Sequence, residues 1–319
     1  MRISVFPKGD LDDILAGRLA LTDWIRAAAG LGVDGVELYS RFFLDADDTL
    51  VDEVAGVLAE TGLAMPMLCA SPDLAHPDPA VRAAEREAEE RMIMIAARLG
   101  GPGVACRVLS GQRHPGVSRD EGVTWVVEAI TALLPLAHEQ QVVLAMENHY
   151  KDGLWRYPEF AQDPDVFCTI IDAIEDRVGF GVQYDPSNAT MAGTDPVAFL
   201  DRVIDRVVTM QASDRRLADG ASLADLAAAD GSAGYAAVLE HGVIGTGLND
   251  YPAIFTRLVA AGYDGWISIE DGVGGWDDLR ASVAFLADAR ERYFGGSRAV
   301  RVPESPYDLE PDQQPRQEH

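Results

Sequence analysis

The stretch AAGYDGWISIE, residues 260–270, has the pattern of a helix end, a glycine turn and a short buried strand. The stretch AGLGVDGVEL, residues 29–38, repeats this pattern near the other end of the chain. Both place an apolar, β-rich run directly after a helix, which is how α/β proteins alternate their elements. The sequence therefore predicts an α/β fold built from repeated units.

Short β-rich runs alternate with longer amphipathic stretches along nearly the whole chain. The candidate strands are at residues 3–6, 35–39, 64–68, 103–107, 142–146, 178–182, 207–210 and 266–269. Helical patterns lie between them, among others at residues 22–31, 49–60, 79–99 and 122–137. These strand-then-helix units favour a closed (β/α)8 TIM barrel over an open doubly wound sheet. No GxGxxG motif follows the first strand, which argues against a dinucleotide-binding sheet.

No segment inside the chain has the composition of a linker between domains. We predict one TIM barrel over residues 1–294 and a polar, flexible C-terminal tail over residues 295–319. The segment from residue 212 to residue 241 is longer than an ordinary loop of a TIM barrel. It is predicted to form a lid or insertion with some helix.

The composition indicates which binding partners and which cellular compartment to expect. The 319 residues carry a formal net charge of −26, and phosphate backbones and anionic lipids repel such a polyanion. We therefore expect binding neither to nucleic acid nor to membranes. Three scattered cysteines, no apolar run of ~18 residues and no apolar leader predict a cytoplasmic protein with reduced thiols.

Polar residues lie at or just beyond the ends of the last four predicted strands. They are Glu147, Asp185, Gln211 and Glu270. Since TIM-barrel active sites lie where strands end, these side chains are expected to meet at one rim. Any one carboxylate could instead cap a helix or form a salt bridge. Metal-capable groups on consecutive strands are better explained by one shared divalent cation.

Several motifs together give the chain a resemblance to a known family. They are ENH at 147–149, YDPSN at 184–188, the ASD after position 211, HGVIGTGLNDYPAIFTRLVAAG at 241–262 and GYDGWISIE at 262–270. Over most of its length the chain resembles the xylose isomerase-like TIM barrel superfamily. This is the sugar phosphate isomerase/epimerase group, which also includes DNA repair enzymes of the endonuclease IV type. The resemblance implies one metal ion held by Glu147, Asp185, residue 211 and Glu270.

Position 211 departs from the family pattern, which usually has histidine there. Gln211 can still coordinate through its amide oxygen. The resulting all-oxygen shell suits Mn²⁺ or Mg²⁺ better than Zn²⁺. The alternative is a site that has lost its metal. Three carboxylates at the matching positions argue against that alternative, because without a cation they would repel one another.

The resemblance also implies a chemistry, which is proton abstraction next to a carbonyl through a metal-stabilised enediolate. Glu147 and Glu270 are the bases that it implies. The predicted function is therefore that of a metal-dependent sugar isomerase or epimerase. His149 is a further candidate base, because it lies two residues beyond Glu147 and points to the same side of an extended strand. Its alternative role is support of the site or packing of the loop.

Further residues near strand ends or in the following loops are candidate substrate contacts. They are Glu37, Arg107, His114, Trp155, Gln183 and Asn188. Arg107 could instead form a buried ion pair with Glu37, and Trp155 could pack in the core or in a lid. The remaining histidines include His138 and His241, which are expected at helical or back-face positions with structural roles.

Two other functions stay open. The chain also resembles the catalytic subunits of C-glycoside deglycosidases, which implies a lyase for 3-keto C-glycosides with His149 as base. The other is a non-catalytic sugar-binding barrel, in which Gln211 marks lost activity. The negative charge and only 6 histidines disfavour an endonuclease. The expected partners are a small sugar or glycoside, with either further copies of this chain or a small β-rich subunit.

Overall fold

The computed structural model describes residues 1–44, 48–228 and 238–295, and its main sheet is parallel throughout. The strands of this sheet are β1 (Arg2–Val5), β2 (Gly35–Val36), β3 (Leu38–Tyr39), β4 (Met67–Cys69), β5 (Ala105–Val108), β6 (Val143–Glu147), β7 (Phe180–Tyr184), β8 (Val207–Ala212) and β11 (Trp266–Ile269). Their order is β2-β1-β11-β8-β7-β6-β5-β4-β3.

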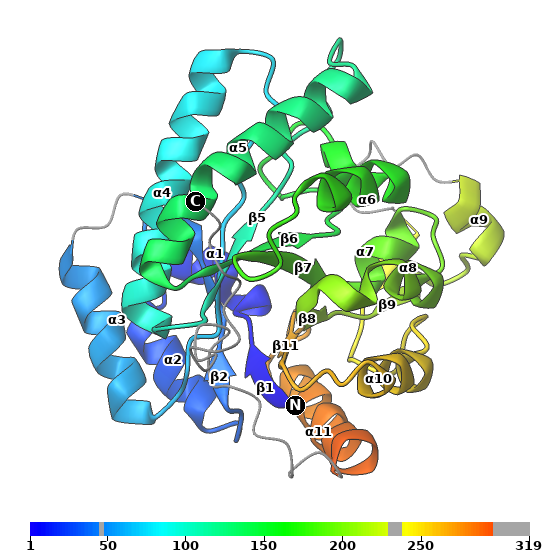
Figure 1. Cartoon of the computed structure of the whole chain (residues 1–319). Helices are drawn as coiled ribbons and strands as arrows, with labels where there is room; N and C mark the ends of the chain where they lie inside the picture. Colours follow the sequence, from blue (N-terminus) through cyan, green and yellow to red (C-terminus); the bar gives the residue numbers. More distant parts are fainter. Residues whose placement is uncertain (45–47, 229–237, 296–319) are drawn as a thin grey trace.

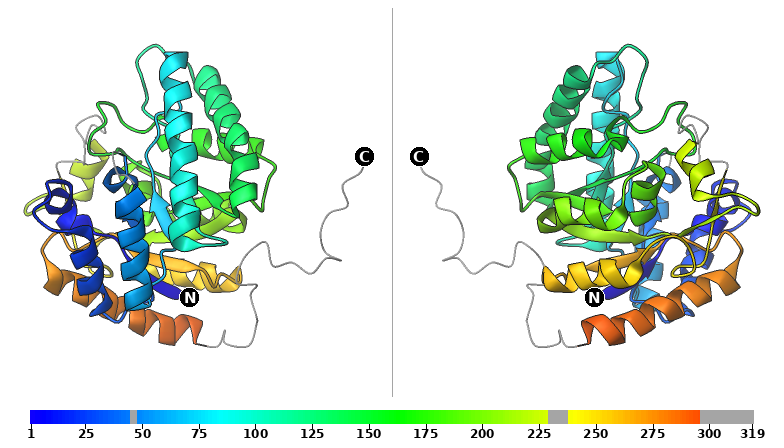
Figure 2. Two further views of the ribbon diagram at one scale, coloured as in Figure 1. Left: turned by 90° about the vertical axis from the view of Figure 1, so that its left-hand side faces the viewer. Right: turned by 90° about the vertical axis from the view of Figure 1, so that its right-hand side faces the viewer.

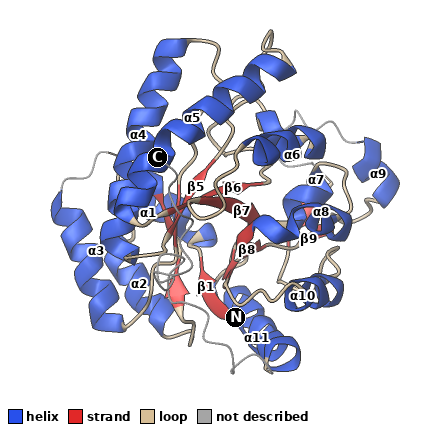
Figure 3. Cartoon of the chain, viewed as in Figure 1, coloured by secondary structure: helices blue, strands red, loops and turns tan. Residues whose placement is uncertain are grey.

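The second stave of the barrel consists of β2 and β3, which are interrupted only at Glu37. β2 pairs with β1, and β3 pairs with β4. Both ends of the sheet therefore belong to one stave, and the sheet closes into a barrel (Figures 1 and 3). The predicted α/β class and TIM barrel are confirmed.

Helices surround the barrel on its outside (Figure 3). The longer ones are α2 (Leu21–Ala29), α3 (Asp48–Thr61), α4 (Pro79–Gly100), α5 (Arg119–Gln140), α6 (Pro164–Ala173), α8 (Pro196–Val203), α10 (Tyr251–Ala260) and α11 (Trp276–Ala289). The shorter ones are α1 (Leu11–Leu15), α7 (Pro186–Met191) and α9 (Leu223–Ala228). The two longest, α4 and α5, lie side by side (Figure 2). None of the helices in the described ranges is long and apolar enough to cross a membrane.

Asp–Pro pairs start several of these helices, at α4, α6, α7 and α8. In each, the aspartate is the N-cap and its side chain accepts a backbone N–H, while proline occupies the first turn. Proline is tolerated there because its missing N–H would have no partner inside the helix. The cap of α7 is Asp185. The same local pattern that begins a helix therefore places this carboxylate at the rim.

The segment predicted as a lid or insertion does carry a helix, α9. Around it, β9 (Arg215–Leu217) and β10 (Leu239–His241) pair antiparallel as a separate sheet. Residues 229–237 of the insertion lie outside the described residues. So does the predicted tail beyond residue 295.

The interior of the barrel is partly apolar and partly polar. A small cluster of buried residues fills part of it, namely Phe6, Tyr39, Met67, Cys69, Ala105 and Ala145. A hydrogen bond also joins Gln211 on β8 to Glu37 on the second stave. Because these staves are not neighbours in the sheet, this bond crosses the interior. The barrel therefore encloses buried polar groups beside its rim.

Candidate active site

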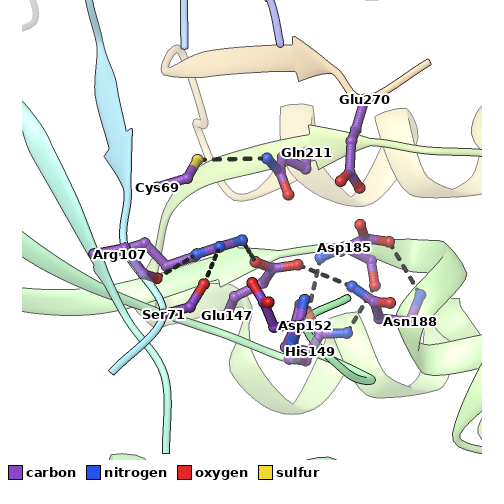
Figure 4. A network of polar contacts seen from close by, with 12 residues as sticks. Cys69, Ser71, Arg107, Glu147, His149, Asp152, Asp185, Asn188, Gln211 and Glu270 are labelled. Atoms are coloured by element: carbon purple, nitrogen blue, oxygen red, sulfur yellow. Dashed lines mark hydrogen bonds and ion pairs between the residues drawn. The ribbon is translucent and has the colours of Figure 1, made fainter. Parts of the chain in front are cut away.

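The structure places the four predicted metal ligands on four successive staves at one rim. Glu147 ends β6, Gln211 lies near the end of β8, and Glu270 directly follows β11. Asp185 follows β7 and caps α7. Figure 4 shows the four side chains pointing toward a common space. Glu147, Asp185 and Gln211 are fully buried, and the Glu270 side chain is only 14% exposed.

Asp185 has one oxygen in use and one without a partner. Its Oδ1 accepts from the backbone N–H of Asn188 at 3.0 Å and from the Ser213 hydroxyl at 2.6 Å. Its buried Oδ2 accepts no hydrogen bond from any described residue. Burial, together with the charges of Glu147 and Glu270, raises the pKa of Asp185 to about 7. No described lysine or arginine forms an ion pair with this carboxylate.

Gln211 has its amide oriented by a hydrogen bond across the barrel. Its Nε2 donates to Glu37 Oε2 at 2.9 Å and to Cys69 Sγ at 3.7 Å. When Glu37 is ionised it can only accept, so the NH₂ group then faces Glu37 and the oxygen faces the other way. That oxygen, Oε1, is buried and has no partner in the described ranges. In Figure 4 it points toward the space between Glu270 and Asp185.

Glu147 is held from two sides. Arg107 donates to its Oε2 at 2.6 Å, and the Asn188 side chain donates to its Oε1 at 2.8 Å. Arg107 is itself fixed by the Ala70 carbonyl at 2.8 Å and the Ser71 hydroxyl at 2.9 Å. Burial opposes the charged guanidinium, but the surrounding acidic groups, Glu147 foremost, together raise the pKa of Arg107.

The alternative prediction of a buried ion pair between Arg107 and Glu37 is therefore wrong. Arg107 on β5 pairs with Glu147 on the neighbouring β6, and Glu37 accepts from Gln211 instead. Glu37 holds the site from inside the barrel, where burial raises its pKa to about 7.

Glu270 has a lysine partner that the sequence did not indicate. Lys8, just beyond β1, donates to Glu270 Oε1 at 2.7 Å. Burial alone would raise the pKa of Glu270, but the charge and hydrogen bond of Lys8 lower it to about 2. His241 also lies near this pair: its pKa is lowered to about 3 by burial and by the positive charges of Arg215 and Lys8. The expectation that His241 lies on the back face is therefore wrong.

The donor atoms are of the types that a hard divalent cation prefers, although the oxygens of Glu147, Asp185 and Glu270 do not all lie within 4.8 Å of one another. Arg107 and Lys8 each balance one carboxylate, whereas Asp185 lacks a cation within the described structure. Two of the unpaired buried oxygens in the described residues, Asp185 Oδ2 and Gln211 Oε1, belong to these predicted ligands and are of the kinds that Mn²⁺ and Mg²⁺ prefer. A buried oxygen without a partner is destabilising, and a bound cation would remove that penalty.

Comparison with known proteins agrees with this geometry. The chain matches the family model described as xylose isomerase-like TIM barrel over residues 25–289. The protein belongs to this family. The resemblance carried by the motifs is thus confirmed. No curated protein sequence matches the chain.

Solved structures similar to this xylose isomerase-like barrel cover nearly the whole chain. A D-tagatose 3-epimerase-like protein has 16% sequence identity and a TM-score of 0.71, with 93% of this chain and 99% of that chain covered. The 3-keto-D-glucoside 4-epimerase of E. coli has 18% identity and a TM-score of 0.63, with 91% and 99% covered. A probable 3-DHS dehydratase from Bacillus anthracis has 16% identity and a TM-score of 0.66, with 90% and 99% covered. At such identities the likeness shows the fold, and this fold carries more than one reaction.

His149 lies beside the rim of the xylose isomerase-like barrel and is largely buried. Its Nδ1 lies 3.4 Å from Glu159 Oε2, and its ring meets Trp155 edge-on with centroids 6.1 Å apart. Burial alone would lower the pKa of His149, but Glu147 and the Glu159 hydrogen bond raise it above its ordinary value. His149 lines a cavity of about 240 Å³ next to Glu270, which suits a base that meets a substrate.

Trp155 lines a second cavity, of about 450 Å³, which adjoins the first. The two cavities share Tyr39, Arg41, Asp152 and Leu154 in their walls. Trp155 therefore lines the adjoining cavity and contacts His149, whereas Glu270 lines the first cavity.

His114 belongs to a separate cluster in the loops after β4 and β5. Its Nε2 lies 2.8 Å from Asp73 Oδ2, and its ring contacts His76 with centroids 4.6 Å apart. Within the described part of the chain, Asp73, His76 and His114 are the group of His, Cys, Asp or Glu ligands whose atoms all lie within 4.8 Å of one another. Asp73 already accepts from the backbone N–H and side-chain amide of Gln112, both at 2.9 Å.

Gln183 and Asn188, two of the predicted substrate contacts, are both buried. Asn188 holds Glu147, as described above. Gln183 on β7 is fully buried, and neither of its amide atoms has a partner among the described residues. The residues of the site that the sequence did not indicate include Lys8, Arg41 and Lys151, which line the 240 Å³ cavity.

Proposed function

We propose that this protein is a sugar isomerase or epimerase that uses one divalent cation, Mn²⁺ or Mg²⁺. Glu147, Asp185, Gln211 and Glu270 would hold the ion. The observation that carries the proposal is a pair of buried oxygens without partners, Asp185 Oδ2 and Gln211 Oε1. The first of them belongs to a carboxylate that no described cation balances. The names of the similar solved structures, mostly sugar epimerases, support the same class of substrate.

A bound divalent ion would polarise a sugar carbonyl and so make the neighbouring C–H more acidic. The protein supplies the base for that proton from Glu147, Glu270 and His149. Glu270 is a poor base, because Lys8 keeps its pKa low. Glu147 is fixed in place by Arg107 and Asn188, and His149 lines the cavity with a raised pKa. We therefore propose Glu147 and His149 for proton transfer and Glu270 mainly as a ligand.

Hydrogen exchange with solvent tests this function whichever sugar the reaction forms. The metal-free protein is incubated in D₂O with D-tagatose, D-psicose, L-ribulose and a 3-keto-D-glucoside, with and without Mn²⁺. The proposal predicts Mn²⁺-dependent deuterium incorporation next to the carbonyl of at least one sugar, followed by appearance of its epimer or isomer. Absence of exchange in all four sugars and in their phosphorylated and carboxylate-bearing counterparts, with Mn²⁺ shown to be bound, would refute it.

A lyase acting on 3-keto C-glycosides is the second candidate, and the adjoining cavity favours it. That cavity carries Trp155 and the exposed Leu154 in its wall, which could contact an aromatic aglycone while the sugar occupies the cavity beside Glu270. Release of a free aglycone from a 3-keto C-glycoside would identify this reaction. Exchange without bond cleavage would identify the isomerase or epimerase.

A further inference from the structure

The lysines of this protein have an unusual distribution. The chain has 26 lysine and arginine residues against 52 acidic ones, and only two of the 26, Lys8 and Lys151, are lysines. Both line the 240 Å³ cavity beside Glu270. Since arginine is the basic residue at all other positions, both ammonium groups of the chain lie in the wall of this cavity.

The basic side chains that lack a partner among the described residues also line this cavity. Throughout the described ranges, the other lysine and arginine side chains make ion pairs, hydrogen bonds or contacts with aromatic rings. Arg41 and Lys151 have no hydrogen bond or ion pair with any described residue, and both line this cavity. In a chain with twice as many acids as bases, two such cations facing one space are a distinct feature.

The described acids of the cavity wall, Asp12, Asp152 and Glu270, form no ion pair with these two cations. Asp152, in the same wall, accepts from the Tyr39 hydroxyl at 2.9 Å and from a backbone N–H at 3.0 Å. Glu270 is paired with Lys8. Arg41 is exposed and Lys151 is partly buried, whereas the Lys8–Glu270 pair is largely buried. The two unpaired cations therefore lie nearer the opening of the cavity, away from the four rim ligands.

We infer that Arg41 and Lys151 bind an anionic group, a phosphate or a carboxylate, on the substrate. The inference rests on the proposed function, because it concerns the same cavity, and it adds the charge class of the sugar. Arg41 offers a planar fork for two oxygens, and Lys151 offers a point charge. With the anionic end held at the opening, the carbonyl end of the sugar reaches toward Glu270 and His149.

Anion binding tests the inference directly and needs no turnover. Full-length protein is titrated with inorganic phosphate and, separately, with acetate by isothermal calorimetry, in the presence of Mg²⁺ and again after metal removal. We expect saturable binding in both conditions, weakened about 10-fold in each of Arg41→Gln and Lys151→Gln by loss of a charge-assisted hydrogen bond. The metal-free arm separates anion binding to the cavity from binding to the ion. Phosphate binding without acetate binding identifies a phosphate group, and the reverse identifies a carboxylate.

Arg18→Gln is the matched control, because Arg18 pairs with Asp13 and does not line the cavity. Its anion affinity should equal that of the wild type. The inference is overturned if the wild type binds neither anion saturably, or if binding survives unchanged in Arg41→Gln and Lys151→Gln. Either result leaves the proposed function intact, since that function depends on Mn²⁺-dependent exchange and not on anion affinity.

Discussion

The rim of the barrel holds two clusters of metal-binding side-chain types, one around Asp185 and one around Asp73, and their oxygens are partnered differently. Both oxygens of Asp73 accept hydrogen bonds, from Gln112 and His114. Asp185 Oδ2 and Gln211 Oε1 accept none from the described residues. The oxygens of Asp73 therefore have their partners within the protein, whereas two oxygens of the Asp185 cluster lack a partner among the described residues.

The comparison shows that ligand type alone does not identify a metal site. By type and spacing, the Asp73 cluster with its two histidines is the closer match to a transition-metal site. By hydrogen bonding, it is a loop connection that joins the segments after β4 and β5. Buried oxygens without partners among carboxylates at the rim are the better sign of a ligand, because leaving such an oxygen without a partner destabilises the fold.

The largest expected effect that separates the two clusters is loss of activity. Asp185→Asn removes the charge that a cation would balance, so Mn²⁺-dependent deuterium exchange into the sugar should fall by more than about 100-fold, beyond the loss typical for outer-shell partners. Asp73→Asn is the matched control, with exchange close to that of the wild type. Mass spectrometry of the recovered sugar measures both. Equal losses of exchange in the two variants would contradict the assignment of the metal site to Asp185 and not to Asp73.

Breaking the buried ion pair between Arg107 and Glu147 should strongly lower the stability of the protein. Arg107→Met leaves Glu147 buried without a cation, and the free energy of unfolding should fall by about 3–5 kcal/mol. Saturating Mn²⁺ should restore part of the loss, because the ion balances Glu147. Urea denaturation with and without Mn²⁺ measures both values. Arg26→Met, which breaks an exposed pair with Glu60, should have a much smaller effect that Mn²⁺ does not change.

A smaller effect is expected from the residue that orients Gln211. Glu37→Gln replaces an acceptor by an amide that can also donate, so the Gln211 oxygen is no longer directed to the site. Mn²⁺ affinity should fall about 10–100-fold, as for other outer-shell partners of a metal. Calorimetric titration with Mn²⁺ measures the change. An unchanged affinity would mean that Gln211 is not a ligand or that Glu37 does not position it.

The smallest expected effect concerns a buried carboxyl that no metal compensates. Glu89 on α4, next to Cys106, has its pKa raised to about 8 by burial. Its folded state therefore holds a proton that the unfolded state releases, and its contribution to stability is lost as the pH rises from about 4.5 through 8. Glu89→Gln should thus be more stable relative to the wild type at pH 8 than at pH 5. Thermal melts with Mn²⁺ present measure the difference, and a pH-independent difference would contradict it.

The barrel and the rim residues could be predicted from the sequence because strands and strand ends are local features. A run such as VVLAM followed by Glu147 carries its own information, and the strand found there, β6, differs from the prediction by one residue. Elsewhere the shift is larger, as at β4, which starts three residues later than predicted. Proline at position 66 cannot donate to a neighbouring strand, and this delays the start.

The pairing of the site residues could not be predicted, because it depends on the register between staves. Arg107 lies opposite Ala145 on β6, so its side chain lies on the same side as Glu147, two residues farther along. Glu37 instead reaches across the barrel to Gln211. Lys8 and His241 reach the rim from a loop and from the insertion, whose return path no local pattern reveals.

The most direct test of a metal site at Asp185 is the number of Mn²⁺ ions bound per chain, measured by calorimetric titration of the metal-free protein. The structure predicts one tightly bound ion in the wild type and in Asp73→Asn, and none in Asp185→Asn. A wild type that binds no ion, or binding that Asp73→Asn abolishes and Asp185→Asn retains, would contradict it.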